Sequence, residues 1–392
     1  MSSILISNVY STRNKGDQAL FESLLDICGP RHVHAVAAAD YSEVSKSYPG
    51  VRVIRLPWES RSKNRFKKRF NNLLGLLLFC LDILLIRGRF TELGCAFRRS
   101  KLVVACAGGY LEDTSVSYYG MLVQIWAAVF LRKQILLAPQ SIGPFRKKWN
   151  QRLCSSIIGR ATSIYIRENL SLSFLSDTAK EKAVFSPDLV LANVNYSRPR
   201  LREATQPRPV VGITLVDAVY YLGRDAATEY IRKIVCVLDE LETRGVDVEI
   251  VTQTIGFAGG TSDEDMIDDV LRARQVVRRK MVPDIASYLE IISGYDAFCG
   301  SRLHSCLFAL KRRVPAVCLS YQPKAQGIYE NLQLSEFVQS IETFNPAHVS
   351  DQLVRLCTDP VFSASIQARL DAAIVKVEEC GRQFVEDVRR RR

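Results

Sequence analysis

Five polar side chains between residues 301 and 324 could act together on a small anion. Arginine and lysine carry positive charge, serine and tyrosine donate hydrogen bonds, and histidine exchanges a proton near neutral pH. This combination suits binding of a negatively charged substrate and acid-base catalysis on it. The five are Ser301, Arg302, His304, Tyr321 and Lys324.

The elements around these side chains predict that they converge. Residues 295–299 and 314–320 are apolar runs typical of buried strands, and a helix is expected to begin at about Ser301. Open α/β sheets bind ligands at the carboxyl ends of their strands, which is where all five residues fall. Taken singly, His304 could be a capping or packing residue and Lys324 a solvated one. A protein core, however, does not need three cationic side chains together at strand and helix ends, so their grouping favours a functional site.

A second set of candidates follows the first expected strand, at residues 4–8. Asn14, Gly16 and Asp17 occupy the joint between this strand and a helix. Asp17 has two interpretations: an N-cap residue, or a carboxylate that takes a proton from a bound hydroxyl or orients it.

Two further loops of the N-terminal half also follow buried strands. Gly108 and Gly109 come directly after the run at 102–106, where they let the backbone approach a ligand. The loop at 139–145 carries two prolines and a glycine that fix its shape, and its polar side chains are Gln140 and Ser141. All four are candidates for contact with substrate.

Arg167 ends a short expected strand at residues 163–166. It could bind a phosphate or carboxylate group, or it could form a surface ion pair with the adjacent Glu168.

Composition indicates a globular protein of two domains. The chain has 392 residues, of which 47% are hydrophobic and 24% charged, and its net charge is +12. No aromatic-rich nucleic-acid motif accompanies the excess of basic residues, so a nucleic-acid partner is not expected. The 11 cysteines are scattered singly, which favours reduced thiols and a cytoplasmic location. No carboxylate cluster suggests a metal site, and no cofactor is expected.

Residues 61–86 combine a basic block, at 61–69, with the Leu-rich run LLGLLLFCLDILLI at 73–86. The run is too short to cross a membrane. It could be an interfacial helix that holds the protein peripherally at the inner face of the membrane, or a core helix after a solvated loop.

Strands alternate with helices on both sides of a polar, Pro-containing segment at 196–209. The pattern predicts an α/β fold with two doubly wound, Rossmann-like domains facing each other, at residues 1–195 and 210–345. The first is expected on the acceptor side and the second on the donor side. Residues 346–392 are expected to form a helical tail with a basic end.

Seven motifs in order resemble the polysaccharide pyruvyl transferase family, over about residues 4–335. The sequence departs from the family at Ala107, where many relatives carry a third glycine. The motifs are Asn14-x-Gly16-Asp17-x-Ala19, the Gly-Gly loop at 108–109, PQSIGPF at 139–145, Arg167-x-x-x-Ser171, Pro187-Asp188-Leu189, Ser301-Arg302-x-His304 and Tyr321-x-x-Lys324.

The resemblance implies a fold similar to GT-B glycosyltransferases and transfer of the pyruvyl group of phosphoenolpyruvate to a sugar, usually as a cyclic ketal with release of phosphate. The sugar would belong to a cell-surface or exopolysaccharide precursor, on a lipid-linked oligosaccharide. Arg167, His304 and Lys324 match positions that are implicated in donor binding and catalysis in the family. The predicted roles are catalysis for His304, Asp17 and Arg302; donor binding for Arg167, Lys324, Arg302, Ser301 and Tyr321; and acceptor binding for Asn14, Gly108, Gly109, Gln140 and Ser141.

Two other functions remain open at this point. A nucleotide-sugar glycosyltransferase of GT-B type would use the same cations to bind a diphosphate. A non-catalytic basic protein would bind glycolipid through residues 61–69 and the terminal arginines. Neither the acceptor sugar nor the oligomeric state can be read from the sequence.

Overall fold

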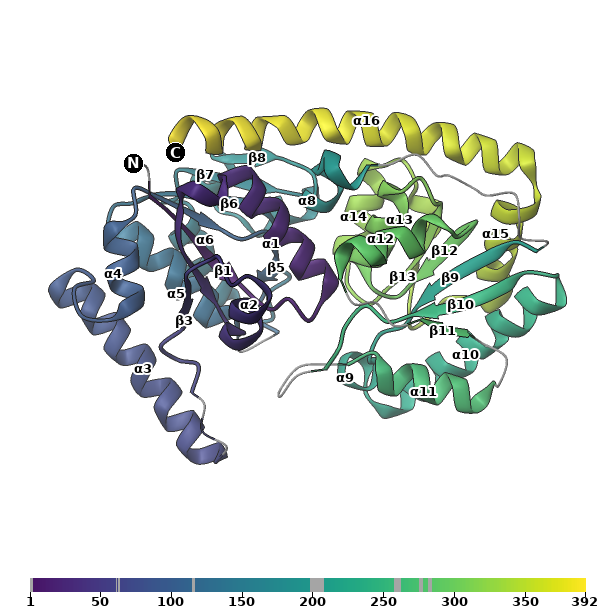
Figure 1. The fold of residues 1–392 in the computed structure, drawn as a ribbon, viewed down its shortest axis with the longest axis horizontal. Coiled ribbons are helices and arrows are strands. Elements are labelled where there is room, and N and C mark those ends of the chain that lie inside the picture. The colour runs from purple at the N-terminus through teal and green to yellow at the C-terminus, as the bar shows by residue number, and fades with distance from the viewer. Residues whose placement is uncertain are drawn as a thin grey trace. The chain divides into compact units, whose positions relative to one another are not determined.

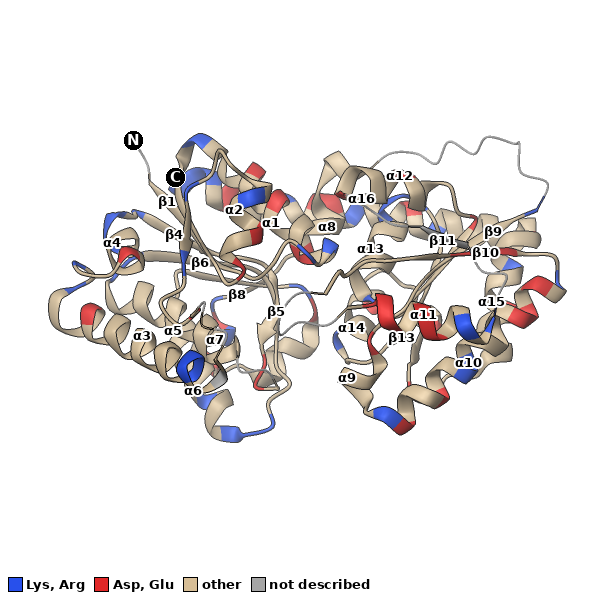
Figure 2. Cartoon of the chain, turned by 60° about the horizontal axis from the view of Figure 1, so that its bottom comes forward, with Lys and Arg blue, Asp and Glu red and all other residues tan. Residues whose placement is uncertain are grey.

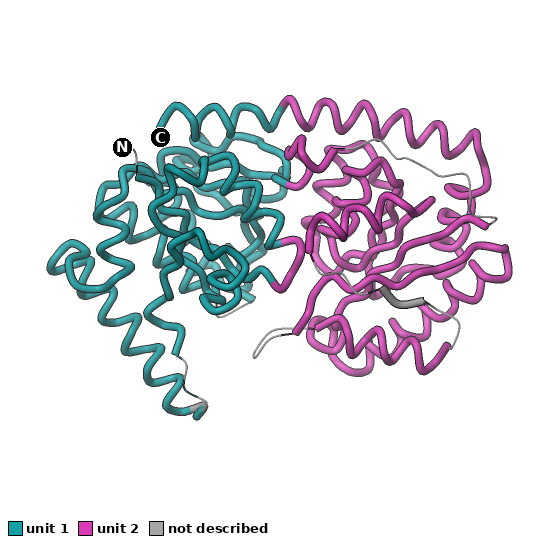
Figure 3. Tube along the Cα trace, viewed as in Figure 1, with its two compact units in different colours: residues 1–12, 17–189, 380–392 teal, residues 13–16, 190–379 magenta. Residues whose placement is uncertain are grey.

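The computed structural model describes residues 3–60, 62, 64–114, 117–197, 208–256, 262–274, 278–280 and 284–392. The chain forms two compact units (Figure 3). Unit 1 comprises residues 1–12, 17–189 and 380–392, and unit 2 comprises residues 13–16 and 190–379. Most of the predicted linker at 196–209 lies outside the described residues.

Unit 1 is built on a parallel sheet in the order β3-β2-β1-β4-β6-β7-β8, with β5 paired to β6 (Figure 1). The first helix, α1, begins at Lys15 and ends at Cys28. The strands of unit 1 are β1 Ile4–Val9, β2 Val33–Ala38, β3 Val53–Arg55, β4 Leu102–Ala105, β5 Gly108–Leu111, β6 Gln134–Ile142, β7 Ser163–Ile166 and β8 Ala183–Phe185. Its other helices are α2 Tyr41–Ser47, α3 Arg65–Ile86, α4 Glu92–Arg99, α5 Ser117–Phe130, α6 Lys148–Ile158 and α7 Asp177–Lys180, and α8 Leu189–Ala192 begins at its boundary.

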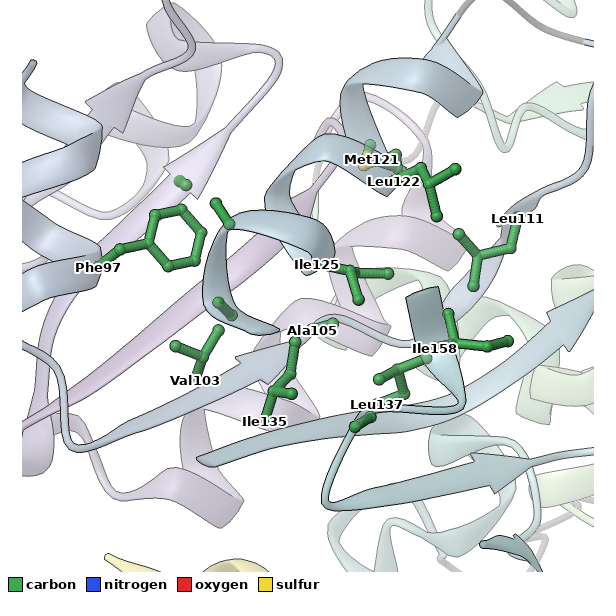
Figure 4. Close-up of a cluster of buried hydrophobic side chains, with 14 of the residues drawn as sticks. Phe97, Val103, Ala105, Leu111, Met121, Leu122, Ile125, Ile135, Leu137 and Ile158 are labelled. Atoms are coloured by element: carbon green, nitrogen blue, oxygen red, sulfur yellow. The ribbon is translucent and has the colours of Figure 1, made fainter. Parts of the chain in front are cut away.

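One core cluster of unit 1 lies between its sheet and the helices that cover one face. Val103 and Ala105 of β4 and Ile135 and Leu137 of β6 point toward Ile125 of α5 (Figure 4). The continuous apolar runs of β4 and β6 are explained by burial on both faces, as in other parallel sheets.

Unit 2 repeats this architecture with the strand order β11-β10-β9-β12-β13-β14, again parallel throughout the described strands. The chain winds one way from β9 through β10 to β11 and the other way from β12 through β13 to β14. Its strands are β9 Val210–Thr214, β10 Asp247–Val251, β11 Arg278–Lys280, β12 Ala297–Gly300, β13 Ala316–Ser320 and β14 Val338–Ser340. Its helices are α9 Ala218–Leu222, α10 Arg224–Thr243, α11 Glu264–Ala273, α12 Ile285–Ser293, α13 Leu303–Lys311, α14 Lys324–Asn331, α15 Pro346–Thr358 and α16 Pro360–Arg391, which continues into unit 1.

Both sheets confirm the predicted pair of Rossmann-like folds and the helical C-terminus. One local prediction is wrong. The loop at 139–145 is a strand as far as Ile142, because Gln140 pairs with β5 on one side and β7 on the other. Helix α13, expected from about Ser301, is buried almost all round, since Phe308 packs against Tyr288 and Tyr196.

Candidate active site

The carboxyl edge of the unit 2 sheet holds the residues singled out between 301 and 324. Strands β9 and β12 are neighbours from which the chain winds in opposite directions, so their ends form a topological switch point. Ser301 and Arg302 follow β12 directly, and Tyr321 follows the adjacent β13. The predicted convergence on one sheet edge is therefore what the fold of unit 2 provides.

Arg302 is a buried guanidinium with an acidic partner that the sequence did not indicate. Its Nε and Nη2 lie 3.1 and 2.5 Å from Oδ1 of Asp263, and both side chains are almost fully buried. Nη1 lies 3.4 Å from the hydroxyl of Tyr221. Burial by itself would lower the pKa of Arg302. The nearby Asp263 carboxylate is the main opposing effect, and the net shift of the pKa is upward. The guanidinium is thus charged and held in one orientation.

Hydroxyl pairs fix the backbone where α13 begins. The hydroxyl oxygens of Ser301 and Tyr230 are 2.7 Å apart, and those of Ser305 and Thr214 are 2.6 Å apart. Ser305 also donates to the carbonyl of Arg302 at 2.6 Å. Helix α13 begins at Leu303 rather than Ser301, which leaves His304 in its first turn as predicted.

His304 lies against the segment formed by residues 13–16, which belongs to unit 2. A Cβ atom on Gly16 would lie 2.5 Å from both Cγ and Nδ1 of His304. Because real Cβ atoms do not approach so closely, only glycine leaves room for the imidazole at this position. The motifs around Asn14 and His304, which lie far apart in the sequence, are thereby brought together.

Asn14 anchors that segment. Its Oδ1 accepts a hydrogen bond from the backbone N–H of Gly16 at 2.9 Å and another from the side chain of Gln253 at 3.1 Å. Lys15 N–H also donates to the Gln253 carbonyl at 3.3 Å. Asn14 therefore acts as the cap of α1, and the alternative that Asp17 is the N-cap is wrong, since Asp17 is the third residue of the helix.

Tyr321 and Lys324 extend the edge beyond β13. The ring centroids of Tyr321 and Tyr221 are 4.2 Å apart, which links Tyr321 to the hydroxyl beside Arg302. Burial, followed by the proximity of Tyr221, raises the pKa of Tyr321, so its phenol stays protonated. Lys324 is half-buried and is the first residue of α14.

Asp17 belongs to unit 1, where its carboxylate accepts a hydrogen bond from the hydroxyl of Tyr110. The Tyr110 ring in turn stacks on Tyr10, with the centroids 5.3 Å apart. Burial, and then the Asp17 carboxylate, raises the pKa of Tyr110 well above its ordinary value. The phenol therefore remains a donor, and Asp17 remains the acceptor.

The other predicted residues of unit 1 take part in its internal packing. Gly108 lies in β5 opposite Gln140 of β6, and Gly109 follows it in the same strand. Nε2 of Gln140 donates to the Cys106 carbonyl at 2.5 Å, which ties down the segment between β4 and β5.

Arg167 is buried and bonded within unit 1. Its Nε donates to Oγ of Ser141 at 2.8 Å, and its Nη1 lies 2.5 Å from Oδ2 of Asp188. The side chains of Arg167 and Asp188 have no exposed surface. Glu168 accepts hydrogen bonds from Ser171, and both Arg167 and Glu168 are buried, so the alternative of a surface ion pair is wrong. Three of the seven motifs thus meet in one buried network.

A family model for polysaccharide pyruvyl transferase matches residues 14–323. The chain belongs to the polysaccharide pyruvyl transferase family. The match begins at Asn14 and ends just before Lys324, so it includes all the predicted site residues except Lys324. The resemblance predicted from the seven motifs is confirmed.

Among curated proteins, the chain is similar to the amylovoran biosynthesis protein AmsJ of Erwinia amylovora, with 23% identity over 237 residues. That similarity covers 55% of this chain and 56% of AmsJ, so the chain spans about half the length of this curated relative.

Solved structures of similar fold include two that cover the whole chain. A glycosyltransferase from Rickettsia africae has a TM-score of 0.60 at 10% identity and is covered to 98% of its length. Sucrose-phosphate synthase from Thermosynechococcus elongatus has a TM-score of 0.60 at 12% identity and is covered to 99%. These likenesses concern the fold alone, and they confirm the predicted GT-B type for this member of the pyruvyl transferase family.

Sequence reasoning missed four residues that contact the candidate site residues: Tyr110, Tyr221, Gln253 and Asp263. Asp263 is separated by 39 residues from Arg302, its partner. A lone acid in a polar loop gives no signal of such a pairing. Tyr110 could have been found, because it directly follows the glycine pair at 108–109.

Proposed function

We propose that the protein transfers the pyruvyl group of phosphoenolpyruvate to a sugar of a polysaccharide precursor, forms a cyclic ketal and releases phosphate. The observation that carries this proposal is the gathering of Arg302, His304, Tyr321 and Lys324 on one sheet edge of unit 2. Membership of the pyruvyl transferase family and similarity to AmsJ support a polysaccharide as acceptor. No cofactor enters the proposed reaction.

The donor explains the charge of this edge. Phosphoenolpyruvate carries a carboxylate and a phosphate, and an enclosed anion needs cationic and hydrogen-bonding partners to replace water. Lys324 and Arg302 supply the positive charge in the proposal, and the hydroxyls of Ser301 and Tyr321 supply hydrogen bonds. Asp263 has a positioning role, because it fixes the Arg302 guanidinium.

The proposed reaction balances with two sugar hydroxyls. Protonation of C3 of the donor gives C2 oxocarbenium character, and one hydroxyl oxygen then bonds to C2. The bond from C2 to the phosphate oxygen breaks and its electron pair leaves with phosphate, after which the second hydroxyl oxygen bonds to C2. The two hydroxyls lose two protons. One returns to the acid that protonated C3, and the other leaves on phosphate.

His304 is the proposed acid-base residue for these proton transfers, because an imidazole both gives and takes a proton near neutral pH. It lies in the first turn of α13 on the same edge as Arg302. Asp17, which follows Gly16 in the chain, is the proposed group that orients an acceptor hydroxyl, and Asn14, Gly108 and Gly109 shape the backbone on the acceptor side.

Arg167, Ser141 and Gln140 take a different place in the proposal from the one their motifs suggested. Arg167 Nε and Nη1 bond to Ser141 and Asp188, and Gln140 Nε2 bonds to the Cys106 carbonyl, all inside unit 1. We therefore assign all three to holding the edge of the unit 1 sheet in shape rather than to contact with substrate.

The test incubates the full chain with phosphoenolpyruvate and a panel of lipid-linked oligosaccharides, which are the proposed acceptors. Phosphate release and a pyruvyl mass gain on one acceptor are expected together. His304→Ala should lower kcat by about 10²–10⁴-fold with little change in the KM for phosphoenolpyruvate. The matched control is His348→Ala, an exposed histidine of the same unit, which should behave as the wild type.

A second candidate is nucleotide-sugar-dependent glycosyl transfer, favoured by the fold shared with the glycosyltransferase from Rickettsia africae. It predicts release of a nucleoside diphosphate from a nucleotide sugar, with no consumption of phosphoenolpyruvate. Release of nucleoside diphosphate, or full activity in His304→Ala, would overturn the preferred proposal.

A further inference from the structure

Helix α3 of unit 1 exposes far more apolar surface than a helix of a water-facing domain should. It is 22 residues long, which is about 33 Å, and its N-terminal half extends away from the strands of unit 1 (Figure 1). Leu73 is 68% exposed and Leu85 is 74% exposed. The exposed apolar residues of the helix are Phe66, Phe70, Leu73, Leu74, Leu77, Leu78, Leu81, Leu84, Leu85 and Ile86.

A narrow stripe on the other side of α3 fixes the helix to unit 1. Phe79 and Ile83 are fully buried, and Phe79 packs edge-on against Trp58 with centroids 5.5 Å apart. A Cβ atom on Gly75 would lie 1.9 Å from the backbone oxygen of Pro57, so this turn of the helix approaches the preceding segment more closely than any other residue would allow.

Asp82 locks the C-terminal part of the same stripe. Its carboxylate accepts backbone hydrogen bonds from residues 89, 90 and 91 at 2.8–2.9 Å and a fourth from the Thr91 hydroxyl at 2.5 Å. The single acidic residue of α3 is therefore satisfied inside unit 1 and contributes no exposed negative charge.

Phe66–Ile86 is long and apolar enough to cross a membrane by length and composition, and an 18-residue window within it has a mean hydropathy of 1.8. Crossing would require breaking the contacts of Gly75, Phe79 and Asp82 with the rest of unit 1. These contacts are satisfied when the helix lies along the domain with its outer face uncovered, which is the geometry of an interfacial helix.

Both ends of the exposed face are basic. Lys67, Lys68 and Arg69 lie in the first turns, and Arg87 and Arg89 follow the last one. Most of the helix between them is neither acidic nor basic (Figure 2). An anionic lipid surface would meet the cations at its headgroups and accept the leucines about 5–10 Å deep.

We propose that the outer face of α3 docks unit 1 onto an anionic lipid bilayer, with the helix lying in the plane of the membrane surface. A second copy of the chain fits the same face less well. Parallel pairing would set Lys67 and Lys68 against their own copies, and antiparallel pairing would set them against Arg87 and Arg89. Either arrangement brings cations together, whereas anionic lipid neutralises both ends. This inference does not depend on the proposed reaction.

The test is co-sedimentation of the purified full chain with vesicles of phosphatidylcholine mixed with phosphatidylglycerol, and with vesicles of phosphatidylcholine alone. Strong binding to the mixed vesicles, weakened by high salt, is expected. Leu77→Glu/Leu81→Glu should reduce binding at least tenfold, because both charges would enter the apolar region. Its matched control is Val361→Glu/Val375→Glu, at exposed valines of α16, which should bind as the wild type.

The charge contribution is tested by Lys67→Gln/Lys68→Gln, which should weaken binding to the mixed vesicles roughly 30-fold, about fivefold per cation. Lys46→Gln/Lys376→Gln, at exposed lysines elsewhere, removes the same charge and should leave binding to the mixed vesicles unchanged. Thermal melting without vesicles checks that every variant folds. The proposal is overturned if the glutamate variant binds like the wild type, if both vesicle types bind equally, or if the wild type ignores vesicles and forms a dimer that Leu77→Glu/Leu81→Glu dissociates.

Discussion

Replacement of Gly16 by alanine should disable His304 without unfolding the protein. The added Cβ would lie 2.5 Å from Cγ and Nδ1 of the imidazole, whereas carbon contacts normally lie at about 3.5–4.0 Å. The ring must therefore shift by about 1 Å. Misplacement of a catalytic group by that amount costs about 10²-fold in rate. Stability should change little, because alanine is favoured over glycine in a helix by up to about 1 kcal/mol, which offsets part of the crowding.

The assay is phosphate release from phosphoenolpyruvate with the acceptor found above, together with thermal melting. Gly50→Ala is the matched control, since nothing lies within 4 Å of a Cβ added there. The double variant Gly16→Ala/His304→Ala should be no slower than His304→Ala, because the first change acts through the second residue. Full activity in Gly16→Ala, or multiplication of the two losses in the double variant, would refute the proposed role of the Gly16–His304 contact.

Three other predictions address single contacts. Lys324→Ala should raise the KM for phosphoenolpyruvate about 10–100-fold, the value of a charge-assisted hydrogen bond, and should abolish thermal stabilisation by the donor; an unchanged KM would exclude Lys324 from donor binding. Arg167→Met should lower the free energy of unfolding by about 3–5 kcal/mol in urea titrations, because it leaves Asp188 buried without its partner, and Arg167→Met/Asp188→Leu should recover much of the loss. Burial lowers the pKa of Lys311 to about 8, although its Nζ lies 2.6 Å from a Glu378 carboxylate oxygen. Above pH 8 the Lys311 amine is therefore more often protonated in the unfolded chain than in the folded chain. The free energy of unfolding of the wild type should therefore rise relative to Lys311→Met, by up to about 3 kcal/mol, between pH 8 and the ordinary lysine pKa of 10.5, and a flat difference would contradict this.

The sequence predicted the parallel sheets and the edge that carries the candidate site because both depend on local patterns. Apolar runs marked the buried strands, and the residues just after β12 and β13 had to lie at the same edge once those strands were parallel neighbours. Short elements were harder to predict. Strand β5 consists of Gly108–Leu111, and glycine pairs give no strand signal.

Pairings between distant residues could not be predicted from the same patterns. Arg302 with Asp263, and Arg167 with Asp188, each join side chains from different loops, and a charged residue in a polar loop is ordinarily solvated. Whether a cation contacts substrate or holds the fold depends on burial, which the sequence does not state. For α3, the proposal of an interfacial helix required the position of its inner stripe, because apolar residues occupy both sides of the helix.

The assignment of residues 13–16 to unit 2 and of residues 380–392 to unit 1 has a practical consequence for engineering. A hybrid made by joining the first half of this chain to the second half of a relative would combine a loop and a terminal helix from one parent with sheets from the other. Hybrids with junctions at 12/13, 16/17, 189/190 and 379/380 keep each sheet with its own segments, and they are the ones expected to fold.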